Sequence, residues 1–145
     1  MSKQSSSSEV ADKLYALAVY LLRDSKKEEQ ASGLTSERLS LLSILFHTGP
    51  QTINSLAETE QVSAPAITRT VKSLEKLGYV IKSRSKTDQR MVYVAPTRKC
   101  HLLLEEARRN RVEGIEQLLH DVSEEDLHLV VRGLAIMERQ IVKNS

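Results

Sequence analysis

The sequence predicts a mainly helical protein with one small β-hairpin, and two observations lead to this fold class. Over most of the 145 residues, apolar side chains recur at the three- and four-residue spacing of amphipathic helices. Between residues 79 and 95 the pattern changes to β-branched and aromatic runs, which are typical of strands. We therefore expect four helices, a hairpin and two further helices, in that order.

The N-terminal part of the chain is expected to form a tail and one helix. Residues 1–8 include four consecutive serines and are expected to be disordered. Residues 9–33 form an N-terminal segment in which a helix ends at the polar stretch Asp24–Gly33. Its narrow apolar seam, with the spacing of a heptad repeat, consists of Val10, Leu14, Leu17 and Leu21.

The central segment, residues 34–97, is expected to contain three short helices followed by the hairpin. Thr35 can cap the first of these helices, the second covers roughly Asn54–Glu60, and Ser63 can cap the third. Pro65 is tolerated in the first turn of the third helix, because no intrahelical donor is lost there. The residues expected to face the core are Leu39, Leu42, Leu45, Phe46, Ile67, Val71, Leu74 and Leu77.

The C-terminal segment, residues 98–145, is expected to form two long amphipathic helices. The first runs to about Val122, and Ser123 caps the second. Their apolar seams, Val112–Val122 and Leu127–Ile141, and the seam of the first helix exceed what one small central domain can bury. We therefore expect the terminal helices to pair across a two-fold axis in a homodimer. Packing of the first and last helices within one chain is the alternative.

Residues 56–71 have the spacing of a helix-turn-helix. Ala57 is small where the two helices would cross, Val62 would fill the turn, and Ile67 would pack beneath Ala57. This packing leaves one face of the second helix free to enter the major groove of DNA, which is about 12 Å wide. Arg69 can pair with guanine, and Lys72 can neutralise a phosphate. The expected DNA-binding residues of this helix are Ser63, Ala64, Ala66, Thr68, Arg69, Thr70 and Lys72.

The hairpin adds a second candidate DNA contact. Its strands are expected over Tyr79–Arg84 and Met91–Ala95, and an arginine on such a narrow ribbon suits the minor groove. Asp88 is expected to brace the loop and its arginine. Residues 63–90 carry seven basic and two acidic side chains, a net charge of +5, whereas the flanking segments carry −2 and −1. The expected DNA-binding residues of the loop are Lys86, Asp88, Gln89 and Arg90.

Together these elements resemble the MarR (multiple antibiotic resistance regulator) family. The resemblance covers the chain from about Val10 to its last residue, and its most specific motif is Asp88-x-Arg90 followed by a strand and Thr97. Two features depart from the family pattern. Gln61 stands in the turn where glycine is usual, and alanines at positions 64 and 66 replace larger polar residues. The motifs that carry the resemblance are Leu34-Thr35, Ile53–Glu58, Val62–Val80 and Thr87–Thr97.

The resemblance implies a winged helix-turn-helix flanked by N- and C-terminal dimerisation helices. Each recognition helix, Ser63–Leu77, would enter a major groove of a palindromic operator in double-stranded DNA, and each wing would reach a flanking minor groove. Family members are mostly repressors. Many are released when a small, often aromatic or anionic, effector binds between the dimerisation helices and the winged domain. The alternative function is a winged-helix protein-interaction module without DNA binding, which would more naturally expose apolar residues in place of its arginines and lysines.

Sensor functions have weaker support in the sequence. Cys100 is the single cysteine, which fits a reducing compartment, and its place at the start of a helix could lower its pKa. A redox role is left open, although peroxide sensors of the resembled family usually carry their cysteine in the first helix. Carboxylates that follow a capping serine have a structural reason to be there, so no metal or other cofactor is expected. The possible metal ligands are His120, Asp121, Glu124, Glu125 and His128.

Catalysis and membrane insertion are not expected. The pairs Ser73-x-x-Lys76 and Ser83-x-x-Lys86 match a loose nucleophile spacing but have no companion motif. With five glycines in all, the chain has no glycine-rich phosphate loop. The apolar run Leu14–Leu22 is too short to cross a bilayer, and we expect a cytoplasmic protein.

Overall fold

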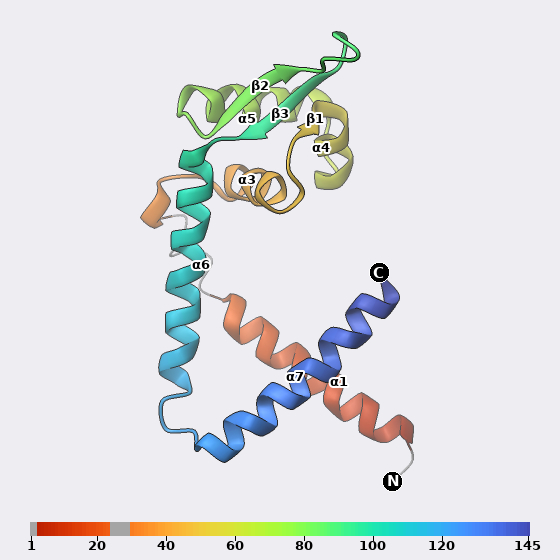
Figure 1. Cartoon of the computed structure of the whole chain (residues 1–145), viewed down its shortest axis with the longest axis vertical. Coiled ribbons are helices and arrows are strands. Elements are labelled where there is room, and N and C mark those ends of the chain that lie inside the picture. Colours follow the sequence, from red (N-terminus) through yellow and green to blue (C-terminus); the bar gives the residue numbers. More distant parts are fainter. Residues whose placement is uncertain (1–2, 24–29) are drawn as a thin grey trace. The chain divides into compact units, whose positions relative to one another are not determined.

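The computed structural model describes residues 3–23 and 30–145 and has the expected mainly helical architecture with one small sheet (Figure 1). The chain divides into two compact units, Met1–Arg109 and Asn110–Ser145. Helix α6 (Arg98–Leu118) carries the chain from the first unit into the second. None of the described helices combines the length and hydropathy needed to cross a membrane.

Helix α1 spans Lys3–Leu22 and begins earlier than the sequence predicts. The expected disorder over residues 1–8 is therefore wrong for residues 3–8, while residues 1–2 lie outside the described part of the chain. Serine costs only about 0.5 kcal/mol relative to alanine in a helix, and extending a helix is far easier than nucleating one. Four serines can thus continue the helix backward. Most of the expected polar stretch, residues 24–29, also lies outside the described residues.

Helices α3 (Ser36–Thr48), α4 (Ile53–Glu60) and α5 (Ala64–Lys76) also belong to the first unit. Both caps that the sequence predicts are present. The side chain of Thr35 accepts a hydrogen bond from the amide of Arg38, and that of Ser63 accepts one from the amide of Ala66. Thr52 caps α4 in the same way. Each cap satisfies one of the amide groups that a helix leaves unpaired at its start.

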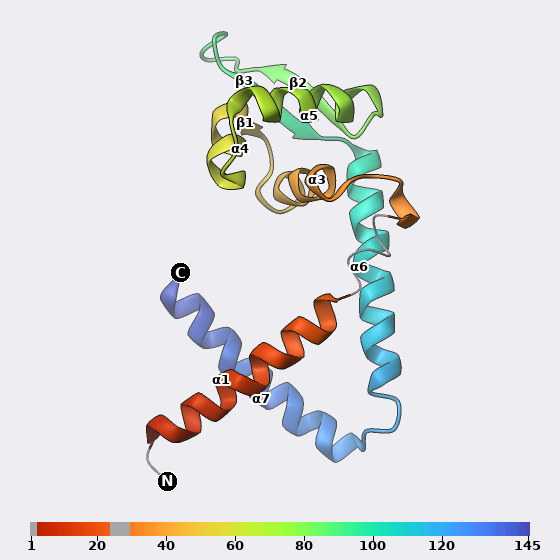
Figure 2. The same ribbon diagram turned by 180° about the vertical axis from the view of Figure 1, so that it is seen from behind.

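The sheet has three antiparallel strands in the order β1-β3-β2. The predicted hairpin is confirmed as β2 (Val80–Arg84) and β3 (Val92–Pro96), with Lys82 opposite Val94. The additional strand β1 (Gln51–Thr52) pairs with the other edge of β3 and is too short to leave a periodic pattern in the sequence. The two opposite views in Figures 1 and 2 show α5 covering one face of this sheet.

The hydrophobic core of the first unit lies between the sheet and helices α3, α4 and α5. Three expected core residues are less buried than the sequence suggests: Leu39 and Phe46 are half-buried, and Leu77 is 42% exposed because it is the C-cap of α5. Leu41, which the periodicity did not single out, is buried. The buried residues are Leu34, Leu41, Leu42, Leu45, Leu56, Ala57, Ile67, Val71, Leu74, Tyr79, Val80, Val94 and Cys100.

The second unit contains the end of α6 and helix α7 (Glu124–Asn144). Helix α6 ends at Leu118, four residues before the expected position, and a turn leads to the predicted cap Ser123, which accepts a hydrogen bond from the amide of Asp126. The apolar seam of α7 is at the surface of the chain, with Leu134 51% and Ile141 64% exposed.

The turn between α4 and α5 contains a left-handed residue. Gln61 has φ 56° and ψ 42°, and it is the one non-glycine residue with positive φ among those the structure describes. The amides of Gln61 and Val62 donate to the carbonyl oxygens of Glu58 and Ala57, at 3.3 and 3.1 Å. This pair of bonds is the Schellman arrangement, which glycine usually completes because it has no Cβ to clash.

We predict that Gln61→Gly raises the free energy of unfolding by about 1 kcal/mol, because glycine removes the left-handed strain of an L-residue. Thermal or urea unfolding measures the change. Gln61→Ala is the matched control, since it removes the polar side chain but keeps the Cβ, and it should give no such gain. Equal stability of the glycine and alanine variants would contradict the prediction.

Candidate nucleic-acid interface

Helices α4 and α5 form the expected helix-turn-helix. Ala57 and Ile67 are both buried in the core, as their ten-residue spacing predicts. The expectation that Val62 fills the turn is wrong, because its side chain is 47% exposed. The turn is instead closed by the backbone hydrogen bonds at Gln61 and Val62, so it requires no apolar plug.

Helix α5 buries one face and exposes the opposite one. Ile67, Val71 and Leu74 lie in the core, so the helical period places Arg69 and Lys72 at the surface, where both are exposed. These are the two long side chains among the α5 residues that the sequence singles out. We call the outward side of α5 its free face.

The short side chains expected on the free face have partners inside the protein. The hydroxyl groups of Thr68 and Thr70 donate to the carbonyl oxygens of Ala64 and Ala66, at 3.0 and 3.2 Å. Ala64 also packs against the core, and Ser63 uses its side-chain oxygen as the helix cap. These side chains are therefore held in place by α5 itself, and the threonine oxygens keep lone pairs that can accept a hydrogen bond.

The loop between β2 and β3, which we call the wing loop, projects away from the helices (Figure 1). Asp88 braces it as expected: its Oδ1 accepts a hydrogen bond from the main-chain amide of Arg90 at 3.0 Å. Ser85 adds a second brace, because its Oγ accepts from the amides of Thr87 and Asp88, both at 3.3 Å. A short loop with these internal bonds can present its remaining side chains in a defined direction.

Arg84 and Ser85 are not among the residues expected from the sequence. Nη1 of Arg84 donates to the carbonyl oxygen of Gln89 at 3.3 Å, which ties the end of β2 to the far side of the wing loop. A serine that bonds amides two and three residues ahead is a known turn signature and could have been recognised. The hydrogen bond of Arg84 could not have been recognised, because it depends on the fold of the loop.

The other residues that the sequence predicts in the wing loop, Lys86, Gln89 and Arg90, are exposed.

Both acidic side chains of the basic segment have partners of their own. Glu75 lies 4.0 Å from Nζ of Lys82 across α5 and β2, and the carboxylate of Asp88 bonds within the wing loop. The exposed cations of α5 and the wing loop belong to the same compact unit. A helix and a ribbon that carry a net positive charge form a surface suited to phosphates.

Comparison with known proteins identifies the family to which a chain with this helix-turn-helix and wing loop belongs. The MarR family model matches residues 34–92. Over 114 residues the chain is 30% identical to Mb0904 of Mycobacterium bovis, which is named as an uncharacterized HTH-type transcriptional regulator; the match covers 79% of this chain and 80% of that protein. The chain belongs to the MarR family. The matched residues include α3, α4, α5 and the wing loop.

Solved structures confirm the winged helix-turn-helix fold of this MarR-family chain. The transcriptional regulator Tm0710 from Thermotoga maritima superposes with a TM-score of 0.87 at 21% identity, covering 94% of this chain and 96% of that one. FabT of Streptococcus pneumoniae, solved in complex with DNA, gives a TM-score of 0.61 at 18% identity and covers 95% of this chain and 99% of its own. At these identities the likeness concerns the fold.

Cys100 does not have the reactive environment that its helix position suggests. Its side chain is fully buried, and its Sγ lies 4.0 Å from the carbonyl oxygen of Leu42. Burial raises the pKa of the Cys100 thiol from 9.0 to about 11, so the expectation of a lowered pKa is wrong. The thiolate is the nucleophilic form, and a buried thiol that stays protonated does not support redox sensing in this MarR-family protein.

We predict that the native chain resists thiol-specific disulfide reagents at pH 8, whereas the unfolded chain reacts with one thiol. Rapid reaction of the native thiol would contradict this prediction.

The raised pKa of the Cys100 thiol also predicts how the stability of the chain depends on pH. Between pH 9 and about 11 the unfolded thiol ionises while the folded one stays protonated, so the free energy of unfolding falls as pH rises, by at most about 1.4 kcal/mol per unit. Cys100→Ala lacks this component and is the control. A free energy of unfolding with the same pH dependence in Cys100→Ala would contradict this second prediction.

The acidic and histidine residues near the start of α7 do not assemble a metal site. Within residues 3–23 and 30–145, no three side chains of histidine, cysteine, aspartate or glutamate are placed to share a metal ion. His120 borders a shallow depression at the end of α6 with Glu113, Glu116 and Gln117. In this MarR-family chain the three carboxylates of the first turn of α7 are accounted for by the helix start that Ser123 caps.

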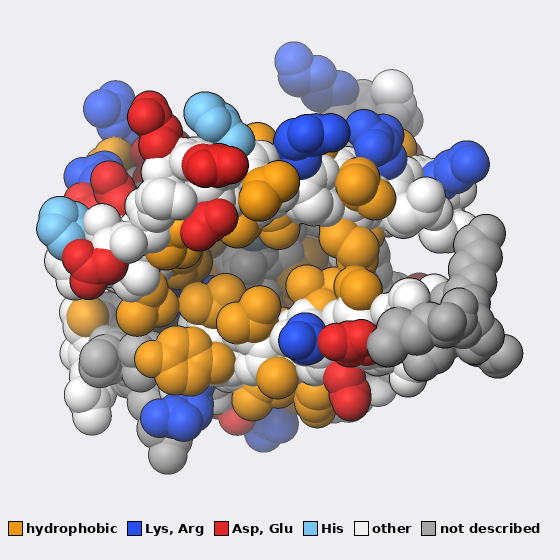
Figure 3. All heavy atoms as spheres, turned by 90° about the horizontal axis from the view of Figure 1, so that it is seen from below, with side chains coloured by type: hydrophobic (Ala, Val, Ile, Leu, Met, Phe, Trp, Pro, Cys, Tyr) orange, Lys and Arg blue, Asp and Glu red, His pale blue; other side chains and the backbone are white. Residues whose placement is uncertain are grey.

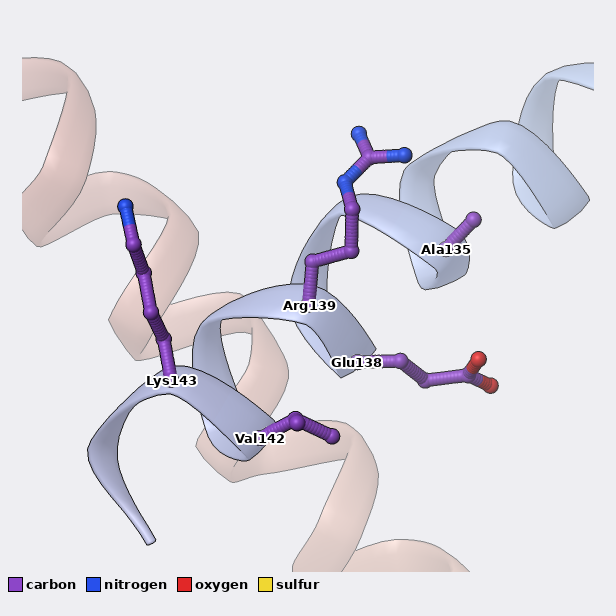
Figure 4. A pocket seen from close by; sticks show the side chains of 5 residues that line it. All are labelled: Ala135, Glu138, Arg139, Val142 and Lys143. Carbon is purple, nitrogen blue, oxygen red and sulfur yellow. The ribbon is translucent and has the colours of Figure 1, made fainter.

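A second shallow depression lies along the C-terminal half of α7. Figure 4 shows that its lining side chains all come from this one helix. Because they project from a single helix, they do not converge as groups around a bound molecule usually do. We therefore assign no effector site to it. The lining residues are Ala135, Glu138, Arg139, Val142 and Lys143.

Proposed function

We propose that this MarR-family regulator binds double-stranded DNA sequence-specifically as a cytoplasmic homodimer and represses transcription from a palindromic operator. One observation carries the DNA-binding part. The free face of α5 exposes Arg69 and Lys72, and the braced wing loop of the same unit exposes Lys86 and Arg90. The DNA complex of FabT, which has the same fold, supports this assignment.

Helix α5 is the recognition helix in this proposal. The guanidinium group of Arg69 can donate two hydrogen bonds to guanine in the major groove, while the ammonium group of Lys72 neutralises a phosphate. Ala64 and Ala66 are small, which lets the backbone of α5 approach the base edges closely. Thr68 and Thr70 donate their hydroxyl protons to α5, so they contribute methyl contacts to thymine or accept from base amino groups.

The wing loop serves the minor groove. Arg90 follows a loop that Asp88 and Ser85 hold in shape, so its guanidinium group can reach the negative potential of a narrow minor groove with less loss of loop entropy. Lys86 lies on the same loop and can meet the phosphates at the groove edge. A protein-interaction module would more naturally expose apolar residues in place of these cations, which favours DNA as the partner.

The homodimer is supported by the apolar residues that the terminal helices expose. Leu17 of α1 is 58% exposed, and Leu134 and Ile141 of α7 are 51% and 64% exposed. The space-filling view in Figure 3 shows hydrophobic side chains at the surface. Seams of this kind need a partner to leave water. A two-fold dimer would present two recognition helices to two half-sites about one helical turn apart, which gives a palindromic operator.

We predict that the chain sediments as a dimer at micromolar concentration and that Leu134→Glu shifts it toward the monomer, because a buried unpaired carboxylate is costly. Analytical ultracentrifugation measures the change. Ile81→Glu is the matched control: Ile81 is 54% exposed, close to Leu134, but lies in β2, so this variant should remain dimeric. A monomeric wild-type chain would refute the dimer.

We predict that Arg90→Ala weakens binding to any duplex and lowers the slope of log affinity against log salt concentration by about one per wing, because one phosphate-region cation is lost. Duplexes selected from a random pool provide the ligand, and binding is titrated at several salt concentrations. Arg108→Ala, which removes an exposed arginine from α6, is the control and should bind as the wild type does.

The same titrations separate base recognition from phosphate binding on α5. Arg69→Ala should cost about 1–3 kcal/mol at its own base pair and relax the selectivity there. Lys72→Ala should instead weaken binding to all duplexes by a similar factor. If neither arginine variant lost affinity, the assignment of the free face and the wing loop to DNA would be refuted.

The MarR-family assignment, rather than a pocket, is what supports repression and release by an effector. We propose that a small aromatic or anionic effector releases the DNA, as such molecules do in many members of the family. The matched relative is named as a transcriptional regulator, and we propose no catalytic activity for this chain.

A further inference from the structure

The C-terminal end of the recognition helix is held by residues at the start of α6. Nζ of Lys99 donates to the carbonyl oxygen of Leu77 at 2.7 Å, and Oγ1 of Thr97 donates to that of Gly78, also at 2.7 Å. The amide of Thr97 donates to the carbonyl oxygen of Tyr79 at 3.0 Å. Three consecutive carbonyl groups after α5 are thus bound by two residues that lie some twenty positions later in the chain.

The chemistry of Lys99 matches this position. The last carbonyl groups of a helix have no intrahelical partner and carry a partial negative charge, so an ammonium group there forms a charge-assisted hydrogen bond. The same Nζ lies 4.5 Å from the ring centroid of Tyr79, within the range of a cation–π contact. Gly78 has φ 82° and lets the chain turn sharply beneath the lysine stem.

The start of α6 is itself anchored. Cys100, the next residue after Lys99, is fully buried, and its amide donates to Oγ1 of Thr97 at 3.4 Å. One turn later, Leu103 and Leu104 pack against the core. The backbone of Lys99 is therefore fixed by the anchored first turn of α6, and its side chain extends from there to the end of α5.

Resting on the proposed DNA-binding function, we infer that Lys99 is a positioning residue, which sets the placement of the recognition helix, and so of Arg69 and Lys72, without touching DNA. Lys72 lies five residues before Leu77, or about 7.5 Å along the helix, and Arg69 about 12 Å. Release of the end of α5 displaces both side chains relative to the wing loop, so the affinity for duplex falls although every proposed DNA-contacting residue is intact.

The test compares Lys99→Met, which keeps the apolar stem but removes the ammonium group, with Lys99→Arg, which keeps a cationic donor. Arg98→Met is the matched control, because it removes the same charge from the neighbouring exposed position. Affinity for a selected duplex is measured at several salt concentrations, well below the melting temperature of each variant. Hydrogen exchange of the amides of residues 73–79 is followed without DNA.

We expect Lys99→Met to bind about fivefold to tenfold more weakly with an unchanged salt slope, and to exchange the amides of residues 73–79 faster. Lys99→Arg should recover most of the affinity, and Arg98→Met should behave as the wild type does. Hydrogen exchange is measured without DNA and reports on the end of α5 alone. It therefore tests the positioning role even if the chain binds no duplex.

Several results would overturn the inference. Wild-type affinity in Lys99→Met would do so, and a salt slope lowered by about one per protomer would show instead that Lys99 contacts phosphate. Equal losses in Arg98→Met and Lys99→Met would reduce the effect to net charge. If the wild-type chain bound no duplex, the proposed function would fail, and unchanged exchange in Lys99→Met would then overturn the positioning role separately.

Discussion

The burial of one face of α5 is the constraint on which the rest of the interface depends. Ile67, Val71 and Leu74 are fixed in the core, and a helix with 3.6 residues per turn that buries this face must expose the opposite one. Arg69 and Lys72 therefore reach solvent because of what lies behind them. The packing of Ala57, the closed turn at Gln61 and the bonds from Thr97 and Lys99 all preserve this orientation.

Features that depend on nearby residues could be predicted from the sequence. The caps at Thr35, Ser63 and Ser123, the hairpin and the Asp88 brace each involve residues within a few positions of one another, so their signals are local. The orientation of α5 followed from its period. These elements, with the MarR resemblance, were sufficient to give the fold class.

The remaining features depend on contacts between distant residues or on burial. Lys99 meets a carbonyl group 22 positions earlier, and β1 exists because β3 offers a free edge. The pKa of Cys100 is raised because the core surrounds its thiol, although the helix start alone suggested the reverse. Residue type alone was also misleading at Val62 and at the serines of α1. It indicated an apolar plug in the turn and a disordered tail, but backbone hydrogen bonds close the turn and the serines continue the helix.

The sparse free face of α5 has an evolutionary consequence. Two of the α5 residues that the sequence singles out are alanines, and two are threonines whose hydroxyl groups bond their own helix, so Arg69 and Lys72 are the long side chains of that set. One substitution at either position would replace one of these two extended groups, while the buried face and its packing stay the same. Under the proposed function, a duplicated copy of the gene could thus acquire a different target sequence through very few substitutions, with little loss of stability.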